Sequence, residues 1–282
     1  MRALSASRLT PLALGLAFIG LTVAGTCATP PDREASSASA GAPGEAAPAA
    51  PATEAVAPPA WSPLGPEGCV LPGDDASPLP ADYVLAAPTF KTTDAVPGEG
   101  ALWVRFDTNY GAMAAELFER EAPLAVANFV GLAQGCWPFA DPETGAPTRR
   151  RAFDGSVFHR VIPGFMIQGG DPAGTGRGGP GYFFDNERNT RSYDSPGYLG
   201  MANRGPNTNG SQFFITLSPQ AHLNQGYTIF GKLAWGLNVV DTIARVPRDG
   251  GNRPLRAARI EQVEIKRAPQ LPWAAPTPSE PQ

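Results

Sequence analysis

Two stretches of this chain, FHRVIPGFMIQGGD at residues 158–171 and GMANRGPNTNGSQFFIT at residues 200–216, decide its fold class. Each contains short apolar runs that Gly, Pro or Asn interrupts. Runs of this kind occur at residues 157–162, 165–168, 198–202, 212–216 and 228–233. Many short strands separated by turn residues are typical of a β-barrel or a β-sandwich. The centre of the chain is therefore predicted to be mainly β.

A hairpin and a helix are predicted ahead of these runs. Apolar residues alternate with other residues over 102–106 and again over 113–117, with the turn sequence NYG between them. This pattern predicts a β-hairpin. Pro123 can open a helix at its first turn, and apolar residues then recur with helical spacing over 126–133 until Gly135.

A second helix is predicted near 239–243, so a helix at each side could plug the open ends of a barrel. Strand parity then separates the faces of the central runs, because successive side chains point to opposite sides. Met166 and Gln168 share one face, and so do Gln212 and Phe214. Apolar groups beside polar ones can mark a binding surface. Periodicity alone leaves open whether Met166 and Phe214 are ordinary core residues.

The two quoted stretches resemble the signature motifs of the cyclophilins, and Ile229-Phe230-Gly231 continues the resemblance, which spans about residues 98–267. It implies a mainly β fold, a closed eight-stranded antiparallel β-barrel capped by two α-helices, with the active groove on the outer face. It also implies a peptidyl-prolyl cis/trans isomerase that acts on proline-containing polypeptides. We expect a monomer that needs no cofactor and no metal.

The resemblance assigns roles to residues by position. It makes Arg160 the catalytic arginine, Gln168 the glutamine of the groove, and Asn203 the residue whose backbone pairs with the peptide. The proline pocket is expected to consist of Phe165, Met166, Phe214 and Leu223. The remaining substrate-binding residues are expected to be Ala202, Gln212, His222, Tyr227, Arg204 and Gly174, the last near an adjoining side pocket.

Three positions depart from the best-known members of the family. His222 stands where Trp is usual, Tyr227 stands where His is usual, and Arg204 replaces a small residue beside Asn203. We expect Arg204 to narrow or charge the neighbouring pocket and so to bias the choice of substrate. Residues 137–151 also form a longer loop than compact members have.

Isomerisation suits these residue types. The X–Pro bond has a rotation barrier of about 18–20 kcal/mol because of amide resonance, and no bond needs to break. A guanidinium placed over the prolyl nitrogen, as Arg160 could provide, binds the twisted amide better than the planar one. The alternative is a chaperone or scaffold that binds proline-containing segments with little turnover.

Other classes of site find little support. The formal net charge of −4 gives no reason to expect nucleic acid as a partner. Residues 174–179 satisfy the pattern GxGxxG, but Pro180-Gly181 follows where the helix of a dinucleotide site should begin. The chain has only two His and three scattered Cys, which does not support a zinc site or a catalytic triad.

The N-terminus is typical of a secretory signal peptide, predicted over residues 1–27. Arg2 and Arg8 accompany an apolar run at 9–24, which is short of the roughly 20 residues that span a bilayer, and small residues follow. Cys27 matches a lipobox imperfectly. Lipidation of Cys27, ordinary cleavage nearby and a retained membrane anchor stay open. We expect an exported protein of the periplasm or cell envelope, lipid-anchored if Cys27 is modified.

Composition divides the remaining chain into segments. Residues 28–60 are almost entirely Ala, Pro, Ser, Gly, Thr and Glu, which predicts a disordered linker, and residues 268–282 are predicted to be a disordered Pro-rich tail. Residues 61–97 are predicted to be an extended segment that packs on the isomerase domain at 98–267. Lipidation of Cys27 would leave Cys69 and Cys136 as an even pair. We expect a disulfide between them in an oxidising compartment.

Overall fold

The computed structural model describes residues 64–65, 68–69, 79 and 83–276 of the chain. The expected signal segment, Cys27 and the expected linker at 28–60 lie outside the described residues. Within the described ranges, no helix combines the length and the apolar character needed to cross a membrane.

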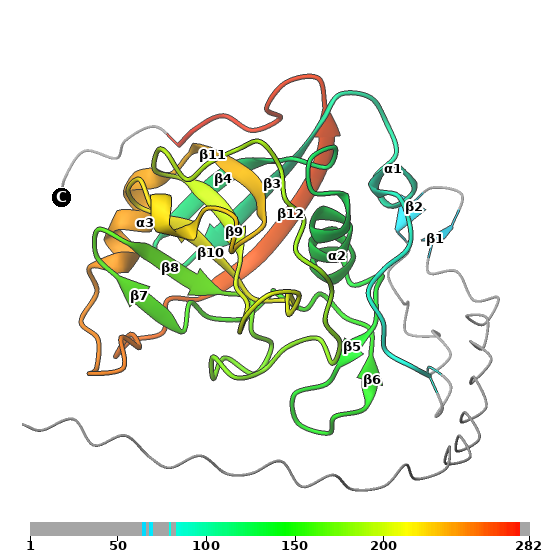
Figure 1. Cartoon of the computed structure of the whole chain (residues 1–282), viewed down its shortest axis with the longest axis horizontal. Helices are drawn as coiled ribbons and strands as arrows, with labels where there is room; N and C mark the ends of the chain where they lie inside the picture. The colour runs from blue at the N-terminus through cyan, green and yellow to red at the C-terminus, as the bar shows by residue number, and fades with distance from the viewer. Residues whose placement is uncertain (1–63, 66–67, 70–78, 80–82, 277–282) are drawn as a thin grey trace, which may run out of the picture. The chain divides into compact units, whose positions relative to one another are not determined.

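One eight-stranded antiparallel sheet forms the body of the domain (Figure 1). Its strands, in spatial order, are β12 (Ile260–Ala268), β3 (Ala101–Thr108), β4 (Gly111–Leu117), β11 (Ile229–Trp235), β9 (Tyr198–Met201), β10 (Phe213–Thr216), β8 (Met166–Gly169) and β7 (Arg160–Ile162). The predicted hairpin is the β3–β4 pair, with Thr108 opposite Gly111. Each of the five central apolar runs overlaps one strand of this sheet.

The sheet is curled but open, so the expected fully closed barrel is wrong in this respect. β12 and β7 are its two edges. They approach each other through an isolated bridge between Val157 and Arg259, where Phe158 N donates to Ala258 O over 2.8 Å. The expected strand 157–162 pairs as a strand only from residue 160 onward. Residues 158–159 are not part of the strand, so strand alternation does not place Phe158 on the same face as Arg160. The side chain of Phe158 lies in the main core.

Two helices cover opposite ends of the curled sheet, as expected (Figure 1). α2 (Pro123–Gln134) packs against β12, and α3 (Leu237–Ala244) packs against β4, β7 and β8. α2 ends at Gly135, whose φ of 78° suits glycine. Its N-terminus lacks a capping side chain at Ala122, and Glu187 takes that place by accepting hydrogen bonds from Leu124 N and Ala125 N, each over 2.8 Å.

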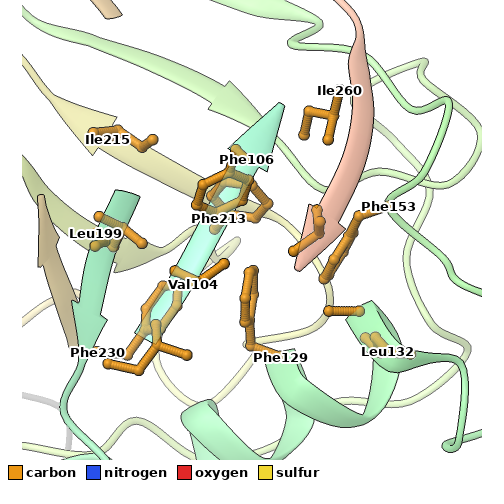
Figure 2. Close-up of a cluster of buried hydrophobic side chains, with 14 of the residues drawn as sticks. Val104, Phe106, Phe129, Leu132, Phe153, Leu199, Phe213, Ile215, Phe230 and Ile260 are labelled. Atoms are coloured by element: carbon orange, nitrogen blue, oxygen red, sulfur yellow. The ribbon is translucent and has the colours of Figure 1, made fainter. Parts of the chain in front are cut away.

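Phenylalanine rings dominate the core between the sheet and α2 (Figure 2). Phe129 points from α2 into the centre of the cluster, where its ring stacks on Phe153 at 5.0 Å and meets Phe213 edge-on at 5.5 Å. Phe106 and Phe230 complete the contacts around it. Through Phe213, this packing joins β10 to the core on the side opposite the expected site.

Two short hairpins and a one-turn helix accompany the sheet and were not predicted. β5 (Phe139–Ala140) pairs with β6 (Pro147–Thr148) inside the long loop at 137–151, and β1 (Leu64–Gly65) pairs with β2 (Gly68–Cys69). The helix α1 (Thr92–Ala95) packs beside α2, and β2 lies against α1.

The described part of the segment expected at 61–97 packs on the domain. Trp137 Nε1 donates to Ala86 O over 2.8 Å, and the rings of Phe90 and Trp137 lie 5.5 Å apart. Cys136, beside Trp137, is buried and disulfide-bonded. The side chain of Cys69 lies outside the described residues, so the pairing of Cys136 with Cys69 stays a prediction.

The beginning of the expected tail is ordered. β12 extends to Ala268, and the chain then turns back so that Trp273 is buried. Trp273 Nε1 donates to Glu264 on β12 over 3.0 Å, and the ammonium of Lys266 lies 5.2 Å from the ring centroid. A single large aromatic side chain thus anchors residues that composition alone marks as disordered.

Candidate active site

A second group of apolar side chains lies on the outer face of the sheet, apart from the core. Strand alternation separates the two groups, because Phe213 and Ile167 enter the core while Phe214 and Met166 belong to the outer group. The buried members of the outer group are Phe118, Met166, Tyr193, Tyr198, Phe214, Leu223 and Ile229. The structure therefore settles the alternative that periodicity left open: Met166 and Phe214 are not part of the main core.

All four residues of the expected proline pocket belong to this outer group. Met166, Phe214 and Leu223 are buried in it, and Phe165 is partly exposed at its margin. The ring of Phe165 lies 5.6 Å from His222, an exposed residue of the short 3₁₀ helix at Ala221–Leu223. The group thus offers an apolar surface with aromatic rims, a chemistry suited to a proline ring.

The rings of Tyr227 and Tyr193 both contact Phe214. Tyr227 meets it edge-on at 5.7 Å, and Tyr193 lies tilted against it at 5.8 Å. Tyr193 is fully buried, and burial raises the pKa of its hydroxyl, so it stays neutral. Gly200 makes the space, since a Cβ there would overlap both the Tyr193 hydroxyl and the Phe214 ring. Sequence reasoning missed Tyr193, because it lies outside the strands and no periodic pattern includes it.

A polar row runs beside this apolar surface. Arg160 on β7 lies directly opposite Gln168 on β8, and Gln168 lies opposite Phe214 on β10. Arg160 Nη1 donates to Gln168 Oε1 over 3.3 Å, and Gln168 Nε2 donates to Gln212 Oε1 over 2.9 Å. The three strands, with Gln212 directly before β10, therefore bring a permanent cation, two amides and an aromatic ring close together.

A cavity of about 380 Å³ adjoins this row. Gln168, Gln212, Ala202, Asn203 and Arg204 contribute to its lining, together with the loop at 176–181. Gly174, expected near this side pocket, does not line it; a Cβ at Gly174 would instead approach Val157.

Arg204 and Phe183 stand at the rim of the cavity. Arg204 is exposed, and its guanidinium donates a hydrogen bond to the carbonyl of Arg177, which also lines the cavity. Phe183 is 61% exposed, which is unusual for so large an apolar side chain. Arg204 therefore lies in the lining of this pocket, and its expected effect on the choice of substrate stays a prediction. Sequence reasoning missed Phe183.

Asn203 is held by the loop that carries Tyr227. Its Nδ2 donates to Gly226 O over 2.9 Å, and its Oδ1 accepts from Gly205 N over 3.3 Å. The side chain is thus committed to the protein, which leaves its backbone as the group that can pair with a peptide.

No cluster of three or more His, Cys, Asp or Glu side chains suited to a metal ion occurs in the described ranges. His159, which directly precedes Arg160 in the chain, is buried, and burial lowers its pKa. It therefore remains a neutral part of the interior rather than a second cation beside Arg160.

Comparison with known proteins identifies this arrangement. The family model described as "Cyclophilin type peptidyl-prolyl cis-trans isomerase/CLD" matches residues 103–265. The chain belongs to the cyclophilin family. It is a cyclophilin-type peptidyl-prolyl cis-trans isomerase, and the expectation drawn from the quoted motifs is confirmed.

Bacterial cyclophilins are among the similar curated proteins. Peptidyl-prolyl cis-trans isomerase A of Mycobacterium tuberculosis is 50% identical over 161 residues, which cover 56% of this chain and 88% of that protein. Peptidyl-prolyl cis-trans isomerase B of Streptomyces anulatus is 48% identical over 169 residues, which cover 58% of this chain and 97% of that protein. The aligned region thus covers most of the length of each of these two relatives.

Solved cyclophilin structures confirm the fold. A crystal structure of a cyclophilin-type isomerase from Cryptosporidium parvum matches with a TM-score of 0.52 and 38% identity, covering 60% of this chain and 99% of that one. A second structure of that protein, in the presence of the dipeptide Ala-Pro, matches with a TM-score of 0.51 and 39% identity, covering 59% and 99%. The curled antiparallel sheet is therefore the cyclophilin sheet.

Proposed function

We propose that this cyclophilin isomerises X–Pro bonds at the outer face of β7, β8 and β10, with Arg160 as the catalytic residue. One observation carries the proposal: the guanidinium of Arg160 lies beside an apolar surface made by Phe165, Met166, Phe214 and Leu223. The Cryptosporidium relative was crystallised in the presence of Ala-Pro, which supports proline-containing peptides as the ligand class.

In this mechanism the apolar surface holds the proline ring while the other side of the amide rotates. As the C–N bond twists, resonance is lost and the prolyl nitrogen regains its lone pair. Arg160 donates to that lone pair and so stabilises the twisted state more than the planar one. Gln168 and Asn203 hold the rotating carbonyl and the flanking peptide backbone.

The remaining residues set which peptides fit. Ala202, Gln212 and Arg204 line the cavity beyond Gln168, so they would contact residues that precede the proline. The charge of Arg204 at the rim favours acidic side chains there. His222 and Tyr227 border the opposite side, next to Phe165 and Phe214, and would contact residues that follow it.

We further propose that the substrates are exported proteins, whose folding the enzyme assists in the periplasm or cell envelope of a bacterium. The signal-like N-terminus supports export. The disulfide of Cys136 fits an oxidising compartment, and the bacterial relatives fit such a source. A flexible linker at 28–60 would let a lipid-anchored enzyme reach its substrates. We propose that the enzyme acts as a monomer.

Cell fractionation tests the anchor. The wild-type chain should be found in the membrane fraction, and Cys27→Ser should move it to the soluble exported fraction, because the Ser variant cannot accept a thioether-linked lipid. A wild-type protein that is already soluble after export would instead favour ordinary signal cleavage near Cys27.

An isomerase assay on the exported protein separates the two functional alternatives. An enzyme should accelerate cis-to-trans conversion of X–Pro tetrapeptides, whereas a binding module would hold the same peptides without accelerating the conversion. Varying the residues before the proline should show a preference for acidic side chains that Arg204→Ala removes.

A further inference from the structure

Two glutamine amides connect Arg160 to the backbone of the loop that follows β8. Beyond the bonds from Arg160 to Gln168 and from Gln168 to Gln212, Gln212 Nε2 donates to Gly178 O over 2.8 Å. A guanidinium can only donate, and a backbone carbonyl can only accept. The two amides between them therefore have a single orientation that satisfies every pair. The Gly178 carbonyl decides that Gln168 turns its oxygen, and not its NH₂ group, toward Arg160.

Asp171 organises the loop that carries this carbonyl. The residue is completely buried at the end of β8. Its Oδ2 accepts from the backbone N–H groups of Thr175, Gly176 and Gly178 over 2.9, 2.6 and 3.1 Å, and its Oδ1 accepts from Ala173 N over 2.9 Å. Burial alone would raise the pKa of Asp171, but these donors together hold it below its ordinary value. The carboxylate is therefore charged, and it fixes the loop by four backbone contacts.

Glycine is required where the loop closes on Asp171. Gly176 has a φ of +82°, and a Cβ there would lie 2.9 Å from the ring of His159. A Cβ at Gly178 would overlap Asp171 Oδ1. Gly178 thus joins the two halves of the network, because its N–H donates to Asp171 while its carbonyl accepts from Gln212.

We propose that Asp171 is a positioning residue for isomerisation: it fixes the Gly178 carbonyl, and through the amides of Gln212 and Gln168 it orients Arg160. This rests on the role proposed above for Arg160. Asp171 itself faces the loop and does not line the cavity, so it acts only through the residues it holds.

Asp171→Asn tests the proposal. An amide presents NH₂ at one of its two positions, so it cannot accept from the donors on both sides as the carboxylate does. We expect kcat/KM for an X–Pro tetrapeptide to fall about 10- to 100-fold, since misplacement of a catalytic group by about 1 Å can cost about 100-fold. The side-chain amide NMR signals of Gln168 and Gln212 should shift in the same variant.

Asp154→Asn is the matched control. Asp154 also accepts a backbone N–H, from Val263 over 2.9 Å, and pairs with Arg151, but it lies outside the network. It should change thermal stability without moving the two glutamine signals or lowering kcat/KM. Glutamine signals that stay unmoved in folded Asp171→Asn would overturn the proposal.

A double-mutant cycle separates positioning from general loosening. Gln212→Leu cuts the network, so Asp171→Asn should lower kcat/KM little further in that background, whereas its effect on stability should persist. Additive losses of turnover would contradict the proposal.

If Asp171→Asn does not fold, Gly178→Ala displaces the same carbonyl and should give the same signal shifts. The NMR measurement reports the orientation of the amides even if Arg160 proves not to be catalytic, so the two proposals fail separately.

Discussion

Phe213 and Phe214 are adjacent residues whose side chains point to opposite faces of β10. Phe213 points into the core among Phe106, Phe129 and Phe153, while Phe214 belongs to the outer apolar surface. The two-residue period of a strand separates them completely. The same separation applies to Ile167 and Met166, so stability and function are divided side chain by side chain along β8 and β10.

We expect Phe214→Ala to weaken peptide binding and turnover together, because the proline pocket is used by both the planar and the twisted amide. Phe213→Ala is the neighbouring control and should cost about 3–5 kcal/mol of unfolding free energy through the cavity it leaves. Isothermal titration with a proline peptide, the isomerase assay and thermal unfolding measure the three effects. Wild-type affinity in folded Phe214→Ala would show that the proline ring binds elsewhere.

A partly buried ion pair joins separate elements at one edge of the domain. Arg267 on β12 has a side chain only 3% exposed, and it forms two hydrogen bonds with Glu119, which follows β4. Arg267 Nε also donates to Val96 O after α1, and the Thr92 hydroxyl donates to Glu119. The pair therefore fastens the segment before the domain to the sheet.

Stability should depend on pH through Glu119. The hydrogen bond from Arg267 outweighs burial and lowers the pKa of Glu119 below 4.5. The stabilisation is thus full above the ordinary Glu pKa and is lost as the pH falls through the lowered value. Glu119→Gln should flatten this dependence and cost between about 1 kcal/mol, as for an exposed pair, and about 3–5 kcal/mol, as for a buried one. Chemical denaturation between pH 3 and pH 7 measures it, and an unchanged acid dependence would contradict the assignment.

Asp241→Asn is the control for that experiment. Asp241 pairs with Arg245 on the exposed side of α3, over 2.8 Å. Exposed pairs contribute only about 0.2–1 kcal/mol, so this variant should leave the curve nearly unchanged.

The elements differ in how well their sequence predicted them. The β3–β4 hairpin, α2 and the five central strands carry their own periodicity and turn residues, so local rules located them. That the sheet stays open could not be predicted, because it depends on whether the two edge strands, β7 and β12, pair with each other along their length. The β5–β6 hairpin and the order after Ala268 depend on tertiary contacts such as that of Trp273 with Glu264.

The candidate site, like the fold, could be predicted from the sequence only in part. The motifs placed Arg160, Gln168, Gln212 and Phe214 on suitable strands, and the structure brings them together. The hydrogen bond from Gln212 to Gly178 could not be predicted, because the loop returns to the strand only through the contacts of Asp171. Tyr193 was likewise missed, since only the folded chain brings its ring against Phe214.

At the scale of the molecule, a disulfide should connect the segment before the domain to the end of α2. Cys136 is disulfide-bonded, and β2, which contains Cys69, lies against α1 beside α2. We expect peptide mapping of unreduced protein to find Cys69 linked to Cys136. Cys136→Ser should lower the unfolding free energy by about 2–5 kcal/mol. Alkylation of Cys69 in unreduced exported protein would show that Cys136 has another partner.

The central claim is that one cation on the outer face of the sheet stabilises the twisted amide. The most direct test is kcat/KM of Arg160→Ala for an X–Pro tetrapeptide, with exposed Arg245→Ala as the control. We predict a loss of about 100- to 1,000-fold, about 2.7–4 kcal/mol, the range for one preorganised donor. Peptide affinity should change far less, and Arg160→Lys should rescue poorly because lysine lacks the planar fork. Near-wild-type turnover by folded Arg160→Ala protein would contradict the account.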